Sequence, residues 1–197
     1  AMADRSLKNS LLGYLMLTGE QQVLNWCVRQ FVEASNMTDR QAALVALVNS
    51  PFELQREAAL ADFAERWAAY PLVMDQWFSV QAMASQPGAL ERVQKLMEHP
   101  LFTMRNPNKV RALIGAFVNQ NLANFHAIDG SGYAFLADRI IELDRSNPQI
   151  ASRLVTPLSR WRKFDDERQA LMREQLSRIL AEKLSPDVYE VVSKSLA

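Results

Sequence analysis

The feature that most constrains this chain is an apolar spacing of three and four residues that recurs along its whole length, with almost no strand-like alternation. The clearest case opens at Asn106 and Pro107 and continues through Val110, Phe117 and Val118. Proline is favourable at a first helical position, where its missing N–H group needs no partner. Short connections separate such segments, and the pattern predicts an all-α protein of about eleven helices.

Helix starts recur at a regular distance. Alternate helices are expected to begin near residues 4, 38, 71, 107, 147 and 186. This spacing of about 33 to 40 residues is the size of one helix pair in an α-solenoid of the ARM or HEAT type. The pairs have little sequence in common, so we expect an irregular α-α superhelix, with a compact orthogonal bundle as the alternative. Residues 1–3 are interpreted as a cloning remnant and residues 4–197 as a single all-helical domain.

The composition argues against some classes of partner. Lys and Arg total 22, as do Asp and Glu, and no basic run is present, so nucleic acid is not an expected partner. No apolar run is long enough to span a membrane. The single cysteine, Cys27, lies in an apolar setting and is expected to be buried, which fits a reducing cytoplasm. The tryptophans and methionines occur at helical spacing and are expected in the core.

The chain offers little catalytic chemistry of its own. Its two histidines, His99 and His126, are far apart and lack the spacing of a zinc motif, so no metal site is expected. Ser131, His126 and Asp129 could be written as a triad, but all three fall in one loop without a strand-turn-helix context. His126 is either a buried histidine bonded to backbone or a polar group on a cavity wall, and its role stays open.

Two arginines occupy matching positions. Arg111 follows Asn106 by five residues and Arg153 follows Asn147 by six, which places both in the second turn of an Asn-Pro helix. If helix pairs stack in order, the two guanidinium groups lie on the same side in adjacent repeats. They are either solvated or paired with neighbouring helices, or they face an anion such as a carboxylate, which the planar guanidinium binds with two parallel hydrogen bonds. Gly115 leaves room for close approach along this face.

Residues 99–172, and especially the segments NPNKVRALIGAF, NFHAIDGSGY and NPQIASRL, closely resemble the C-terminal part of the bacterial aminopeptidase N family. These are the alanyl aminopeptidases among the M1 zinc metallopeptidases, and the similarity extends over the whole chain after AMA. The resemblance implies a C-terminal superhelix of paired helices that closes over the catalytic domain of the same polypeptide. It also implies a parent reaction in which zinc polarises a carbonyl group and activates water, so that peptides lose their N-terminal residue.

The chain departs from this family in its catalytic motifs. The His-Glu-x-x-His motif and the Gly-x-Met-Glu-Asn segment are absent, and Tyr133 does not match the catalytic tyrosine. The resemblance therefore implies a non-catalytic fragment, with zinc in the parent's catalytic domain. The segments around Arg111 and Arg153 are similar to those that face the family's cavity, so both are expected to bind peptide substrate. Which residue the parent enzyme prefers is not implied. A freestanding helical-repeat scaffold for a protein partner is the alternative.

Overall fold

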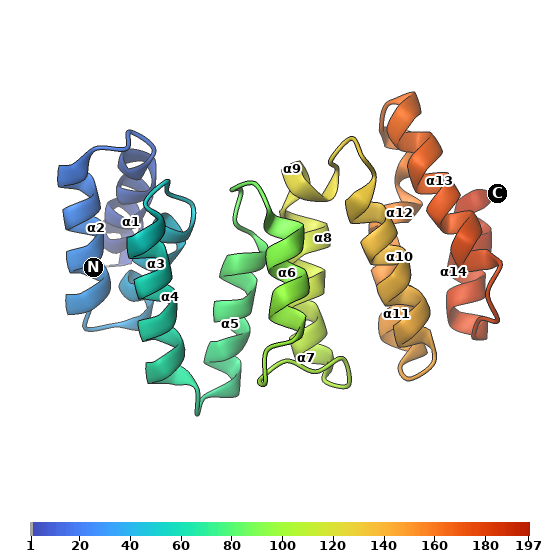
Figure 1. Ribbon diagram of the computed structural model, residues 1–197, viewed down its shortest axis with the longest axis horizontal. Coiled ribbons are helices and arrows are strands. Elements are labelled where there is room, and N and C mark those ends of the chain that lie inside the picture. Colours follow the sequence, from blue (N-terminus) through green and yellow to red (C-terminus); the bar gives the residue numbers. More distant parts are fainter. Residues whose placement is uncertain (1) are drawn as a thin grey trace. The chain divides into compact units, whose positions relative to one another are not determined.

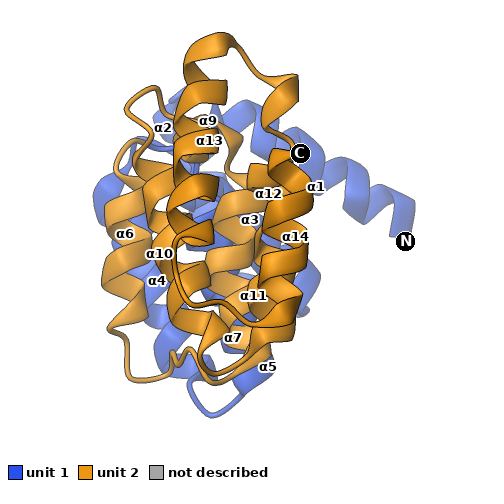
Figure 2. Ribbon diagram, turned by 90° about the vertical axis from the view of Figure 1, so that its right-hand side faces the viewer, with its two compact units in different colours: residues 1–86 blue, residues 87–197 orange. Residues whose placement is uncertain are grey.

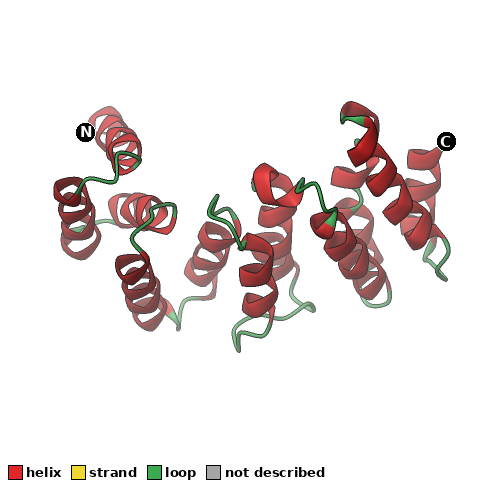
Figure 3. Ribbon diagram, turned by 45° about the horizontal axis from the view of Figure 1, so that its top comes forward, coloured by secondary structure: helices red, strands yellow, loops and turns green. Residues whose placement is uncertain are grey.

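The computed structural model describes residues 2–197, and these consist of helices and loops without a strand (Figure 3). The chain divides into two compact units, residues 1–86 and residues 87–197 (Figure 2). When contiguous segments are joined, the described residues form twelve helices, against about eleven predicted. The additional helix is α9 (Leu122–Phe125), which lies in a segment that the sequence pattern left without an element. No helix among residues 2–197 is long and apolar enough to cross a membrane.

Unit 1 contains five helices, in which α1 and α2 pack on α3, α3 on α4, and α4 on α5. Its bounds are α1 (Met2–Met16), α2 (Gln21–Glu33), α3 (Met37–Val48), α4 (Glu53–Trp67) and α5 (Pro71–Ala82). The starts predicted near residues 4 and 38 lie within two residues of the observed ones. Asn36 caps α3, because its side chain accepts the Asp39 N–H group at 3.0 Å. Asp4 lies within the first turn of α1.

The core of unit 1 is the face that these helices share. Its fully buried side chains include Leu24, Leu44, Phe63 and Phe78. Cys27 belongs to this core, as predicted, with its Sγ atom 3.4 Å from the Ala43 carbonyl oxygen. Burial raises the pKa of this thiol to about 12, so the thiolate does not form at neutral pH.

Unit 2 contains the remaining helices. Their bounds are α6 (Ala89–Met97), α7 (Pro107–Val110), η1 (Arg111–Gly115), α8 (Ala116–Gln120), α9 (Leu122–Phe125), α10 (Ser131–Asp144), α11 (Pro148–Leu154), α12 (Thr156–Ser159), η2 (Trp161–Lys163), α13 (Asp166–Leu180) and α14 (Pro186–Leu196). Within the unit, α10 packs on α11 and α13, and α14 packs on α11 and α13. Helices that are next to each other in sequence and helices two or three positions apart therefore both pack together in this unit.

The predicted caps of unit 2 are confirmed. Asn106 accepts the Asn108 N–H group at 2.9 Å, and Asn147 accepts the Ile150 N–H group at 3.2 Å. Both helices that these residues open begin at the same end of unit 2 and run in the same direction (Figure 1). The break between α11 and α12 falls just before Pro157, because proline has no N–H group with which to continue the hydrogen bonds of a helix.

The tryptophan prediction holds only in part. Trp77 and Trp161 are buried, and each indole N–H group donates to a backbone carbonyl, of Leu60 and of Ser195 respectively, at 2.9 Å. Trp26, in contrast, is 43% exposed, because it lies on the outer face of α2. A helical spacing shows that a face is apolar but not whether another element covers it.

Candidate functional site

The segment α7, η1 and α8 is a single helical run from Pro107 to Gln120 that is buried on almost every side. Val110, Leu113 and Phe117 are fully inaccessible to solvent. One strip of this run remains open, formed by Asn108, Arg111, Gly115 and Asn119, which we call the α7–α8 strip. Arg111 therefore lies off the apolar side of this run.

A π-helical turn, η1, lies at the centre of this strip. The N–H group of Ala116 donates to the carbonyl of Arg111, five residues earlier, as in a π-helix. The Asn119 side-chain amide donates to the Gly115 carbonyl at 2.9 Å. The periodic apolar pattern gave no sign of this turn. Single π turns inside α-helices occur often at functional sites, so the turn supports a functional interpretation of the strip.

Arg111 is exposed at the start of the π turn. Its Nη1 atom donates to the neutral Oδ1 atom of Asn108 at 3.1 Å. No carboxylate in the described part of the chain lies within ion-pair distance of it. The hydrogen bond to Asn108 holds the guanidinium group along the strip without neutralising its charge.

Arg153 lies on α11, in the position that corresponds to Arg111. It is exposed, while its neighbours Leu154 and Ala151 are buried. Its side chain has neither a hydrogen bond nor an ion pair with any of residues 2–197. The sequence left two ordinary explanations for these arginines, which were solvation and a salt bridge to a neighbouring helix. Neither arginine forms such a salt bridge with residues 2–197, and both are exposed to solvent.

The positions of Arg111 and Arg153 are related through the helices that carry them and not through a contact between the two side chains. Helices α7 and α11 start at the same end of unit 2 and are parallel, with α10 packed against α11 and α9 (Figure 1). Arg111 and Arg153 each lie in the second turn of their helix, counted from the capping asparagine. Both positive charges therefore lie near the same end of this unit. Each exposed guanidinium group can bind a carboxylate or a carbonyl oxygen.

His126 is part of a packed cluster. Its Nδ1 atom is 2.8 Å from the hydroxyl oxygen of the buried Tyr133, and its carbonyl accepts the Nε–H group of Arg168 at 2.9 Å. Its ring centroid is 4.3 Å from that of Phe164. Burial lowers the pKa of His126, and the charge of Arg168 lowers it further, so the ring is neutral at neutral pH. The hydrogen-bond partner is a side chain, where the sequence suggested backbone.

The neighbouring loop is structural as well. Ser131 donates both its N–H and its hydroxyl group to the same carboxylate oxygen of Asp129, at 3.0 and 2.7 Å. His126 is bonded to Tyr133 and not to Ser131, so these residues do not form a triad. Gly130 adopts a φ of +70° and opens α10, which explains the glycine there.

Two polar residues near the strip escaped the sequence reasoning. Lys109 is only 5% exposed, although the preceding residue on the same helix, Asn108, is exposed. His99 accepts the Leu101 N–H group through Nδ1 at 3.1 Å, and burial followed by the charge of Lys109 lowers its pKa. A lysine inside an amphipathic pattern is normally read as solvent-facing, so no sequence signal identified this burial. Among residues 2–197 no group of three or more His, Cys, Asp or Glu could hold a metal ion.

These features define an all-helical repeat protein in which two exposed arginines have no acidic partner among residues 2–197. The chain belongs to the family described as a domain of unknown function (DUF3458_C) with ARM repeats, which matches residues 1–197. This confirms the predicted ARM-like, all-helical fold class.

Known proteins similar to this chain are aminopeptidases. Aminopeptidase N of Escherichia coli is 44% identical over 198 residues and aminopeptidase N of Haemophilus influenzae is 43% identical over 196 residues. The crystal structure of Legionella pneumophila aminopeptidase A in complex with aspartic acid matches 98% of this chain, with 38% identity and a TM-score of 0.92. The chain spans only 22% of the length of the first two relatives and 23% of the third. A freestanding scaffold is not favoured by these matches.

Proposed function

We propose that this chain is the C-terminal helical domain of a zinc-dependent aminopeptidase of the M1 class. The observation that carries the proposal is the match of nearly the whole chain to 22% of two proteins named aminopeptidase N, at 43 and 44% identity. The parent polypeptide removes N-terminal residues from peptides. Its zinc ion and its catalytic groups belong to the part of the polypeptide outside this chain, which by itself is inactive.

The role of the chain in that enzyme is to wall the substrate cavity and to position the peptide. The catalytic domain of the same polypeptide and the peptide substrate are its partners, and neither nucleic acid nor a membrane is required. We place the enzyme in the cytoplasm, because a single buried thiol such as Cys27 suits a reducing compartment.

Arg111 and Arg153 are the residues that we assign to the substrate. Three observations support this assignment: both are exposed, neither has an acidic partner among the described residues, and their helices start at the same end of unit 2. A guanidinium group donates two parallel hydrogen bonds to a carboxylate, so the C-terminal carboxylate of a short peptide is the preferred ligand. The arginines orient the peptide and take no part in the hydrolysis.

The test uses the complete enzyme. Arg111→Ala and Arg153→Ala should each lower kcat/KM for short peptides roughly 10-fold to 100-fold, the value of a charge-assisted hydrogen bond, and should affect the corresponding C-terminal amides much less. Arg160→Ala is the matched control. Arg160 is also exposed, but it lies directly after the C-terminal end of α12 and not in the second turn of an Asn-capped helix. Equal losses for free peptides and amides would contradict carboxylate recognition.

The parent assignment is tested separately on the native polypeptide. Its mass should be several times the 22.4 kDa of this chain, and its activity on alanyl substrates should disappear with a zinc chelator. A native polypeptide of 22.4 kDa without such activity would overturn the assignment.

A further inference from the structure

Helix α1 carries two apolar faces, of which unit 1 uses only one. Leu12 and Met16 are buried against the rest of unit 1. A second stripe with the spacing i, i+4, i+7 and i+8 points outward, formed by Leu7, Leu11, Tyr14 and Leu15, which are 61, 51, 73 and 42% exposed. Stripes of this spacing normally pack against another helix.

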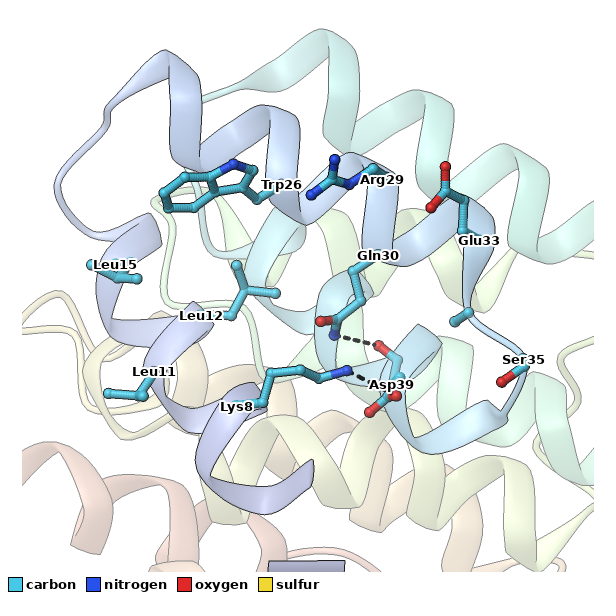
Figure 4. Close-up of a pocket in the computed structure, with 11 residues that line it drawn as sticks. Lys8, Leu11, Leu12, Leu15, Trp26, Arg29, Gln30, Glu33, Ser35 and Asp39 are labelled. Atoms are coloured by element: carbon cyan, nitrogen blue, oxygen red, sulfur yellow. Dashed lines mark hydrogen bonds and ion pairs between the residues drawn. The ribbon is translucent and has the colours of Figure 1, made fainter. Parts of the chain in front are cut away.

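A groove between α1 and α2 extends this outer face. It measures about 510 Å³ and is lined by Leu11 and Leu15 from α1 and by Trp26 from α2 (Figure 4). Trp26, which is 43% exposed, lies across the groove from these leucines. The outer stripe and the groove form one apolar surface, which we call the α1–α2 face.

The rim of the α1–α2 face is charged. Lys8 forms an ion pair with Asp39, and its Nζ atom lies 2.9 Å from the Asp39 carboxylate. Arg29 and Glu33 line the groove on α2, and neither has a hydrogen bond or an ion pair with another described residue. A positive and a negative group one helical turn apart beside an apolar groove match the polar edge of an amphipathic helix.

Exposed apolar side chains of this size are concentrated in unit 1. In unit 2, only Leu122, Ile128 and Tyr189 are exposed large apolar residues, and they lie on separate elements. In repeat proteins each repeat buries its apolar faces against its neighbours, and a terminal repeat carries a polar outer face. The outer face of α1 does not have the character of a terminal repeat.

We propose that an amphipathic helix of the same polypeptide, from the part outside this chain, covers the α1–α2 face. This inference rests on the proposed function, in which the chain is one part of a longer enzyme. Since the chain spans 22% of the aminopeptidase N relatives, most of such a polypeptide lies outside it and can supply this helix. The helix places apolar side chains on Leu11, Leu15 and Trp26, and an acidic and a basic group opposite Arg29 and Glu33.

Amide hydrogen exchange of α1 in two proteins, the longer polypeptide and this 197-residue chain, tests the proposal. The amides of residues 7–15 should exchange at least tenfold more slowly in the longer polypeptide. There, Leu11→Lys should restore fast exchange of α1, whereas Tyr189→Lys, a change of the same kind at a 57% exposed position in unit 2, should not. In the 197-residue chain Leu11→Lys should leave the exchange of α1 unchanged, because lysine is a good helix former.

Equal exchange of α1 in both proteins would overturn the proposal. A second result would also overturn it: the 197-residue chain forms a dimer that Leu11→Lys dissociates, while α1 stays unprotected in the longer polypeptide. The α1–α2 face would then be covered by a second copy of the chain. The two proposals fail separately. A longer polypeptide with protected α1 but without aminopeptidase activity would overturn the proposed function alone, and a native chain of this length would overturn both.

Discussion

Two glycines show how differently single residues can constrain this chain. A Cβ atom on Gly132 would lie 2.3 Å from the carbonyl oxygen of Phe125, an impossible contact with backbone. Phe125 is itself fixed, because its ring packs edge-on against Phe117 and Tyr133 at 6.1 and 5.3 Å between centroids. A Cβ atom on Gly115 would meet nothing closer than the Val110 carbonyl oxygen at 3.7 Å. The first glycine is required by close packing, while the second is not.

We expect Gly132→Ala to lower the free energy of unfolding by at least ~2 kcal/mol, the usual cost of forcing atoms into a packed core. Gly115→Ala is the matched control and should change it by less than ~1 kcal/mol, in the stabilising direction, because alanine restricts the unfolded chain. Urea unfolding of both variants measures the difference. A tolerated Gly132→Ala would show that α10 can move away from Phe125.

The sequence predicted the surface residues of the candidate site better than the buried ones. Arg111 and Arg153 could be placed in the second turn of their helices, because that requires only the capping asparagine and the helical period. The contact of His126 with Tyr133 could not be predicted, since the chain between them turns through Gly130 in a left-handed conformation. The burial of Lys109 depends on neighbours from other helices, which a local pattern does not contain.

At the scale of elements, one residue, Asp39, joins three helices through its carboxylate and its backbone carbonyl. Asp39 of α3 accepts hydrogen bonds from Lys8 at 2.9 Å and Asn9 at 3.0 Å, both on α1. Gln30 of α2 donates to the Asp39 carbonyl at 3.0 Å and to the Asn9 side chain at 2.9 Å. Burial alone would raise the pKa of Asp39, but the hydrogen bonds of Lys8, Asn36 and Asn9 outweigh it and lower the pKa to about 2.

Asp39→Asn should therefore destabilise unit 1 by about 1–3 kcal/mol, because it removes a charge-assisted acceptor from a largely buried position. The contribution of Asp39 should also depend on pH. Its folded pKa of about 2 is below the ordinary 3.8, so the stability is present above pH 3.8 and is lost as pH falls towards 2, where the folded carboxylate also takes up a proton.

Chemical denaturation at several pH values measures both effects. Between pH 4 and pH 2 the Asp39 carboxylate contributes to the pH dependence of the unfolding free energy. This contribution should disappear in Asp39→Asn. Glu190→Gln is the control, since the Glu190–Lys194 pair joins two largely exposed side chains and should leave the unfolding free energy nearly unchanged. An unchanged acid dependence in Asp39→Asn would contradict the role of Asp39 as the junction of α1 and α3.

At the scale of the whole molecule, the helix count and the class of fold were predictable, whereas the division at residues 86 and 87 was not. Caps and apolar spacing are local signals, so Asn106 and Asn147 marked helix starts correctly. The short helix α9 carries no period of its own within four residues. Compact units depend on which helices touch, and the apolar period does not contain that information.

Unit 2 has its own core, so residues 87–197 should fold without unit 1. Leu113, Phe117, Leu136 and Leu158 are all buried within it, and Trp161 and Arg162 bind the Ser195 carbonyl near its end. A domain of this size can bury enough surface for independent stability. We expect a cooperative unfolding transition, measured by circular dichroism of the separate segment. A gradual loss of helix without a cooperative transition would show that unit 2 depends on unit 1.

The π turn of η1 also has a consequence for the angular phase of its helix. In an α-helix, positions four residues apart drift by about 40° per step, so a line drawn through residues 111, 115 and 119 would wind around the axis. The wider π turn opposes this drift and keeps Arg111, Gly115 and Asn119 on one open strip. Removal of one residue from this turn would rotate all that follows by about 100°, carrying Phe117 and Val118 out of the core. The extra residue thus acts as a phase correction between the polar strip and the buried side of the same helix.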